Sequence, residues 1–194
     1  MKLNKLQKKI GITFKDDKLL IQALTHKSFD TQNNYEKLEF LGDRVLGFVI
    51  SKKLLELYPD EKVGIIDKKF ANLVNKKTCV EIAKKLNLRK YIYLGSSHRG
   101  HERSVDKIIS DCIEAIVGAI YIDGGLKSAE KFVLIFWDTY LDKSTITLID
   151  PKTKLQEYSL KRFKVLPQYF FFKKSGLQHK PIFKTEVEIP KAKI

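Results

Sequence analysis

One stretch of the chain, at residues 35–58, reads YEKLEFLGDRVLGFVISKKLLELY. Its apolar residues are so dense that a helix built from it has no wide polar face, which is typical of a central, buried helix. The stretch nevertheless carries Glu39 and Asp43 four positions apart on one helical face, with Glu36 one turn earlier. Burying carboxylates costs free energy unless positive charge meets them. The sequence therefore predicts a source of positive charge beside this helix.

A second apolar stretch, at residues 105–122, repeats this combination. It places Asp111 and Glu114 three positions apart, and so on one helical face, among small residues that include Gly118. Gly42 lies in the same way beside the acidic face of the first helix. Because small residues let two helices approach closely, we expect the two acidic faces to meet and to bring four carboxylates together.

Four neighbouring carboxylates that are partly desolvated would not all stay ionised. A divalent cation removes this conflict, and ligation by oxygen alone favours Mg²⁺ or Mn²⁺ over zinc. The alternative is that the acids face solvent or pair with lysines, since acidic pairs at helical spacing are common. In a basic protein, a Mg²⁺ cluster indicates phosphodiester chemistry, with Asp43 and Glu114 the acids expected nearest the metal and its water.

Composition narrows the class of partner. The net charge is +14 and the pI about 9.6, which indicates an acidic polymer, with nucleic acid first and an anionic membrane second. The plain alternative is a lysine-rich composition without functional meaning. Cys79 and Cys112 lie in apolar helical patterns and are expected to be core residues of a reduced, intracellular protein. No apolar run is long enough for a signal peptide or a membrane span, so a cytoplasmic location is expected.

Further helices are expected around this pair. Asp16 or Asp17 can cap one of them, and Pro59 ends the first acidic helix. His26 stands at an apolar-to-polar transition and is predicted to be a structural, hydrogen-bonding residue. The remaining helices are predicted at residues 3–10, at 65–75, at 78–86 with a capping box that starts at Thr78, and at 126–141 with the tryptophan Trp137.

The character of the chain changes after Pro151. Residues 151–194 carry 11 Lys and Arg against 3 Asp and Glu, which is typical of a nucleic-acid-binding appendage. A helix is predicted at residues 153–163. Strands are predicted at 168–174 and 182–189, with a Lys-Lys-Ser-Gly turn region between them.

Several segments resemble the ribonuclease III family. YEKLEFLGDRVL is closely similar to the family's signature segment, and ALTHKSF, LVNKKTCVEIAKKL and SDCIEAIVGAIYID are further matches in the family's order. PKTKLQEY and the two predicted strands resemble the start of a double-stranded-RNA-binding domain. The resemblance implies a mainly α fold. It consists of an all-helical endonuclease domain at residues 3–145, a linker at 146–150, and an incomplete α/β RNA-binding domain, a helix plus two strands, at 151–194.

The resemblance also implies an activity and the residues that carry it. It implies a homodimer that cuts both strands of double-stranded RNA with Mg²⁺, for which Mn²⁺ can substitute, leaving 5′-phosphates and short 3′ overhangs. Ribosomal precursors and structured messages would be the substrates. By position, Glu39, Asp111 and Glu114 match the family's metal ligands, and Asp43 and Glu114 match its catalytic acids. Glu36 matches an accessory acid near the dimer seam or the RNA.

In the appended domain, the resemblance implies four RNA-binding residues. Thr153, Gln156 and Glu157 match helix positions that touch the RNA minor groove, and His179 lies in the loop between the two strands. Such domains recognise A-form shape and 2′-hydroxyls rather than sequence. From the residues alone, Gln156 and Glu157 could equally be ordinary helix-surface residues.

The sequence departs from the family in two places. Val63 stands where the family usually has a glutamate after the central helix, with Glu61 two residues away. The sequence ends at Ile194, before the third strand and second helix of a complete RNA-binding domain. We therefore expect weak retention of RNA and an apolar sheet face without a covering helix.

Two other classes of function compete with the enzyme. A catalytically silent ribonuclease III-like protein, RNA-binding or ribosome-associated, would be favoured by loss of one of the four main carboxylates, and all four are present. A protein of the membrane surface is the weaker alternative, because no basic amphipathic helix with a large apolar face stands apart from the expected core. We therefore expect no membrane partner.

Overall fold

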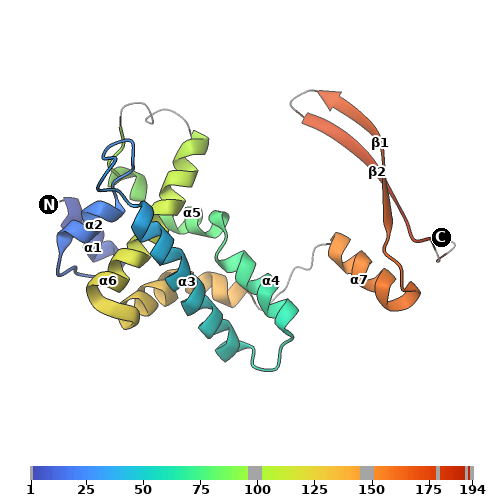
Figure 1. The fold of residues 1–194 in the computed structure, drawn as a ribbon, viewed down its shortest axis with the longest axis horizontal. Helices are drawn as coiled ribbons and strands as arrows, with labels where there is room; N and C mark the ends of the chain where they lie inside the picture. The colour runs from blue at the N-terminus through green and yellow to red at the C-terminus, as the bar shows by residue number, and fades with distance from the viewer. Residues whose placement is uncertain (1, 96–101, 145–150, 178–179, 191, 193–194) are drawn as a thin grey trace. The chain divides into compact units, whose positions relative to one another are not determined.

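The computed structural model describes residues 2–95, 102–144, 151–177, 180–190 and 192 (Figure 1). The chain divides into two compact units, Met1–Thr147 and Leu148–Ile194. In the described part of the first unit the regular elements are helices, joined by loops with an isolated parallel bridge between Thr25 and Tyr93, and the second unit contains one helix and a two-stranded sheet. The predicted fold class, mainly helical with a helix and two strands at the end, is confirmed.

Two helices form the centre of the first unit, α3 (Glu36–Leu57) and α6 (Glu102–Lys143). They pack against each other along apolar faces whose members are almost completely buried, among them Leu46, Ile50, Leu54, Ile113, Ile116 and Ile120. The expectation that α3 is buried all round is wrong on one side. Phe40, Phe48 and Leu55 form an exposed apolar stripe on this helix, because no described element of the chain covers it.

A glycine divides α6 into two halves. Gly125 has a φ of 74°, in the left-handed region that favours glycine, and the helix kinks there (Figure 1). The two helices predicted on either side of residues 123–125 are therefore confirmed as the two halves of α6. In the second half, the fully buried Trp137 donates a hydrogen bond through Nε1 to the carbonyl of Leu73, at 2.8 Å.

Smaller helices complete the first unit. They are α1 (Lys2–Ile10), α2 (Asp17–Ala23), α4 (Val63–Leu73), α5 (Lys76–Lys85) and the 3₁₀ turn η1 (Leu88–Lys90). As predicted, Asp16 caps α2, and its side chain accepts a hydrogen bond from the Lys18 amide. His26 is buried, and its Nδ1 lies 2.8 Å from Ser28 Oγ, which confirms a structural hydrogen-bonding role.

The predicted start of α5 is wrong. The side chain of Asn75 accepts a hydrogen bond from the Thr78 amide at 2.9 Å, so the helix begins before Thr78. Thr78 lies in the first turn, and its hydroxyl donates to the carbonyl of Asn72. Two residues able to cap a helix stand three positions apart here, and the earlier one stabilises the longer helix.

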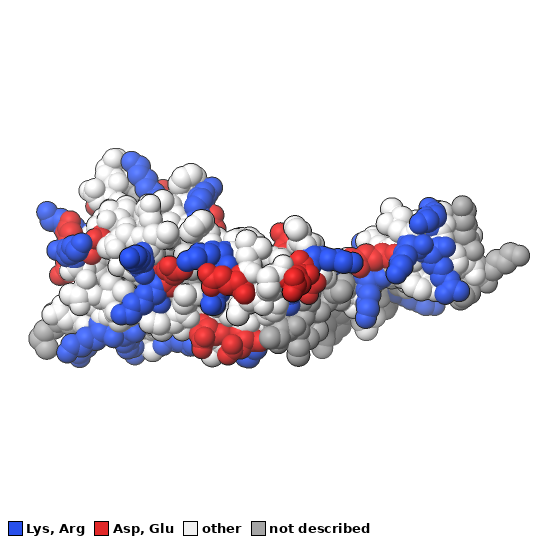
Figure 2. Space-filling view, turned by 90° about the horizontal axis from the view of Figure 1, so that it is seen from below, with Lys and Arg blue, Asp and Glu red and all other residues white. Residues whose placement is uncertain are grey.

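The second unit contains α7 (Pro151–Phe163) and an antiparallel hairpin of β1 (Gln168–Leu177) and β2 (Lys180–Glu188). The predicted turn at Lys-Lys-Ser-Gly is wrong, since residues 173–176 pair with residues 181–184 inside the hairpin. A two-stranded ribbon presents much of its surface to water, so polar residues can continue the strand. Basic side chains outnumber acidic ones over this unit in the view of Figure 2.

Candidate active site

The acidic faces of α3 and α6 meet where two glycines face each other. A Cβ on Gly42 would lie 1.8 Å from the carbonyl oxygen of Glu114, and a Cβ on Gly118 would lie 2.2 Å from the carbonyl oxygen of Leu38. Neither position has room for a side chain. The predicted close approach of the two helices is therefore confirmed, and its cause is the pair of glycines.

An open hollow lies at this crossing, with a volume of about 390 Å³. Glu39 and Asp43 reach it from α3, and Glu114 reaches it from α6. Its described lining residues are Glu36, Glu39, Phe40, Asp43, Arg44 and Glu114. Asp111 is one turn before Glu114 on α6 and is buried, with 9 % of its surface exposed. The hollow thus joins carboxylates from two helices that are far apart in sequence.

The acids of this cluster influence one another. Burial, followed by repulsion from Asp43, Glu39 and Asp111, raises the pKa of Glu114 to about 8. Burial and the charge of Asp111 also raise the pKa of Glu39. The folded chain therefore brings the four acids close enough to raise the pKa of Glu114 and Glu39, as the sequence predicts.

Cations of the chain meet part of this negative charge. Arg44 Nη1 lies 2.9 Å from Asp43 Oδ2, and Lys107 Nζ lies 2.8 Å from Asp111 Oδ2. Glu36 is paired with Lys27 at 2.9 Å. Among the described residues, no group of three or more His, Cys, Asp or Glu side chains already stands in place to hold a metal ion. Two of the four main acids are turned toward these cations.

The donor set fits a divalent cation of the Mg²⁺ type. The hollow offers carboxylate oxygens, the ligands that Mg²⁺ and Mn²⁺ prefer. Glu114 and Glu39 are disfavoured in their charged forms until positive charge arrives, as their raised pKa values show. Glu39, Asp111 and Glu114 remain the residues predicted to hold the ion.

Sequence reasoning did not identify three neighbours of the cluster. The Tyr35 hydroxyl donates to Asp111 Oδ2 at 3.4 Å, and the thiol of the buried Cys79 lies 3.8 Å from Glu114 Oε1. Lys107 is the third. The four-residue spacing between Lys107 and Asp111 could have revealed that pair. Tyr35 at the N-cap of α3 and Cys79 of α5 contact acids of α6, and the sequence has no local pattern that predicts contacts between different helices.

The remaining predicted residues lie elsewhere. Val63 is the first residue of α4, and 82 % of its surface is exposed. In the second unit, Thr153 and Gln156 are half-buried and Glu157 is exposed, at a spacing that puts all three on one side of α7. His179 lies outside the described residues. The RNA-binding roles of these residues stay predictions.

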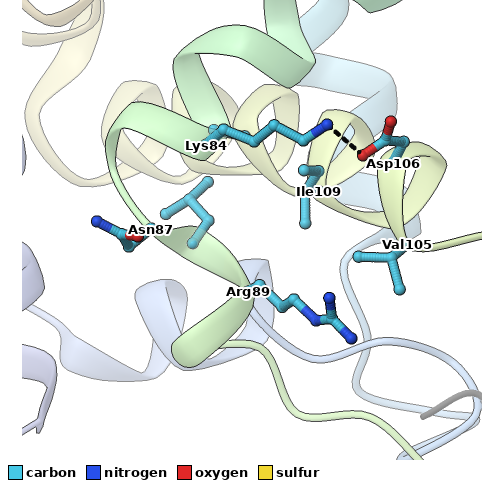
Figure 3. Close-up of a pocket in the computed structure, with 8 residues that line it drawn as sticks. Lys84, Asn87, Arg89, Val105, Asp106 and Ile109 are labelled. Carbon is cyan, nitrogen blue, oxygen red and sulfur yellow. Dashed lines mark ion pairs between the residues drawn. The ribbon is translucent and has the colours of Figure 1, made fainter. Parts of the chain in front are cut away.

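A second hollow, of about 390 Å³, lies between α5, η1 and the first half of α6 (Figure 3). Lys84 of α5 forms an ion pair across it with Asp106 of α6, at 2.9 Å. Arg89 of η1 extends toward Val105. The described residues that line this hollow include none of the predicted acids, so it is separate from the carboxylate cluster.

The raised pKa of Glu114 predicts a pH-dependent stability of the metal-free protein. The ordinary pKa is 4.5 and the folded value about 8, so between these values the folded chain holds a proton that the unfolded chain has lost. The free energy of unfolding should therefore fall as pH rises through this window, by up to about 4 kcal/mol. Urea denaturation in EDTA between pH 5 and 8 measures this change.

The control for this measurement is Glu81→Gln on α5, an exposed glutamate that accepts a hydrogen bond from Tyr140. It should retain the pH dependence, whereas Glu114→Gln should lose most of it. An equal dependence in both variants would show that Glu114 is not the group responsible.

No helix among the described residues is long and apolar enough to cross a membrane.

The Ribonuclease-III-like family model matches residues 16–138. A Ribonuclease 3 of Pelagibacter ubique is 57% identical, covering 100% of this chain and 88% of the relative. A Ribonuclease 3 of Bartonella bacilliformis is 38% identical, with 97% of this chain and 81% of the relative covered.

Solved structures agree with these relatives. The nuclease domain of a ribonuclease III from Campylobacter jejuni has a TM-score of 0.67 and 37% identity, with 72% of this chain and 99% of that domain covered. A Dicer structure from Pichia stipitis has a TM-score of 0.55 at 18% identity, with 89% of this chain and 80% of that one covered, and shows the fold alone. The chain therefore belongs to the ribonuclease III family of double-stranded-RNA endonucleases.

Proposed function

We propose that this chain cuts both strands of double-stranded RNA in a Mg²⁺-dependent reaction, leaving 5′-phosphates and short 3′ overhangs. Ribosomal precursors and structured messages are the proposed substrates, and Mn²⁺ is the proposed substitute for Mg²⁺. The observation that carries the proposal is the glycine contact between α3 and α6, because it gathers acids from both helices around one open hollow.

We assign the roles from the position of each acid. Glu39, Asp111 and Glu114 are the proposed ligands of Mg²⁺, which when bound supplies a Lewis acid for the phosphate and an activated water. Glu114 Oε1 is oriented by the Cys79 thiol. In the metal-free chain its pKa is about 8, so a cation that binds at neutral pH would displace a proton from this carboxyl. The exposed Asp43 stands at the rim, where RNA would arrive, and Glu36 is the proposed accessory acid.

The exposed apolar stripe of α3 supports a homodimer. Phe48 and Leu55 border a shallow groove of about 520 Å³, and Phe40 lies further along the same helix. Large exposed apolar residues gathered on one face are typical of a protein interface. The structure from Campylobacter jejuni is described as flexible in a region involved in dimer formation of the nuclease domain. We propose that a second copy of this chain covers the stripe.

The proposed domain boundaries are residues 3–145 for catalysis, 146–150 for the linker and 151–194 for RNA binding. In the last of these, Thr153, Gln156, Glu157 and His179 are the proposed RNA contacts. The exposed Ile182, Phe183 and Val187 on β2 agree with a sheet that has no covering helix within the described residues. Charge attraction to phosphates would supply most of its affinity, since 11 basic residues stand against 3 acidic ones.

Incubation with a long RNA duplex tests the proposed function. With Mg²⁺ we expect short duplex products that carry 5′-phosphates, and with EDTA intact RNA. The competing function is a silent RNA-binding relative, which the exposed Val63 at an expected glutamate position favours. Binding of the duplex without cleavage, at every Mg²⁺ concentration, would support that relative instead.

A further inference from the structure

Lys107 differs from Arg44, which is also paired with an acid of the cluster, because the partner of Lys107, Asp111, is buried whereas the partner of Arg44 is exposed. It lies on α6 one turn before Asp111, and its Nζ contacts Asp111 Oδ2 at 2.8 Å. Besides Asp111, the charges of Glu39 and Glu114 raise the pKa of this lysine. In return, Lys107 partly offsets the rise in the pKa of Glu39. The positive charge of Lys107 thus acts on acids of both helices, Glu39 on α3 and Asp111 and Glu114 on α6.

The two partners of this ion pair differ in exposure and in freedom to move. Lys107 Nζ and the Tyr35 hydroxyl both contact the same oxygen of Asp111, Oδ2. Asp111 is buried, whereas 66 % of the Lys107 side chain is exposed. A buried carboxylate is expensive without a partner, and a flexible lysine is a partner that can move away.

We propose that Lys107 is a built-in counter-ion of the carboxylate cluster, which holds Asp111 in the metal-free protein and gives way when a divalent cation binds. This inference rests on the proposed function, because it takes Asp111 as a metal ligand. Lys107 is a positioning residue here and takes no part in bond cleavage. A cation already beside a ligand competes with the metal, so this lysine would weaken metal binding and ease metal release.

Direct binding of Mn²⁺ to the full chain tests the inference, with free Mn²⁺ measured by its electron paramagnetic resonance signal. Lys107→Met should bind Mn²⁺ about fivefold more tightly than the wild type, because a competing charge is removed. Lys107→Arg keeps the charge and should remain within about twofold of the wild type. In an Asp111→Asn background, Lys107→Met should have a much smaller effect, since the contact it removes is already weakened.

The matched control is Lys84→Met, which removes a lysine from a similar ion pair with α6, at Asp106, outside the carboxylate hollow (Figure 3). It should leave Mn²⁺ affinity unchanged. A second readout is the melting temperature in EDTA, which should fall for Lys107→Met and recover when Mn²⁺ is added.

Unchanged or weaker Mn²⁺ binding by Lys107→Met would overturn the inference and leave the proposed function in place. If that variant instead binds an RNA duplex more weakly at unchanged Mn²⁺ affinity, Lys107 is a phosphate contact and not a counter-ion. Absence of Mn²⁺ binding by the wild type would contradict the proposed function itself, and this inference with it.

Discussion

Replacing Gly42 with alanine is expected to destabilise the first unit by about 3 kcal/mol or more. The new Cβ would lie 1.8 Å from the Glu114 carbonyl oxygen, 2.7 Å from its carbonyl carbon and 2.8 Å from the Gly118 amide nitrogen. All three atoms belong to the backbone of α6, so no side chain can rotate out of the way. The two helices would have to separate, and the acids they carry would separate with them.

Gly47→Ala is the matched control, because it makes the same change on the same helix. Its Cβ would meet Phe70 Cζ at 3.5 Å, an ordinary contact. Alanine is the better helix former by about 1 kcal/mol, so this variant should be as stable as the wild type or slightly more stable. Urea denaturation measures both variants. Equal midpoints for Gly42→Ala and Gly47→Ala would show that the helices do not need this contact.

Glu114→Gln is expected to lower the rate of duplex cleavage at least about 1,000-fold, which corresponds to about 4 kcal/mol in the barrier. The amide has nearly the same shape but cannot carry the negative charge with which Glu114 would hold the metal ion. Because the side chain lies at the helix crossing and not in the basic second unit, binding of RNA should stay within about threefold of the wild type. Single-turnover cleavage and a gel-shift titration in EDTA separate the two effects.

Glu81→Gln again provides the control, since it removes the same charge from α5 while both cleavage and binding should persist. A Glu114→Gln protein that still cuts at more than a tenth of the wild-type rate would remove this residue from the catalytic role. Loss of RNA binding together with cleavage would instead point to a damaged fold.

The central pair of helices could be predicted because the relevant information is local. Apolar density identified α3 and α6, and helical spacing put Glu39 with Asp43 and Asp111 with Glu114. The glycines beside these acids predicted the close approach, and a Cβ at Gly42 or Gly118 indeed has no room. Each of these patterns lies within a single helix, so it can be recognised from the sequence alone.

Other features depend on competition or on distant contacts. Asn75 and Thr78 have similar ability to cap a helix, and the sequence does not show that Asn75 is the residue that caps α5. The sequence could not distinguish the exposed Phe40 and Phe48 from core residues. An apolar side chain looks the same in the sequence whether or not another helix covers its side of α3. The contact between Cys79 and Glu114 joins different helices at a distance of 35 residues in the chain.

The central claim is that the crossing of α3 and α6 creates one divalent-cation site from acids of both helices. Titration of Mn²⁺ into the metal-free protein tests it most directly, with Glu39→Gln from α3 and Glu114→Gln from α6 beside the wild type. We predict that each variant binds Mn²⁺ at least about tenfold more weakly, while Glu81→Gln binds it like the wild type. Wild-type affinity in both Glu39→Gln and Glu114→Gln would contradict the claim.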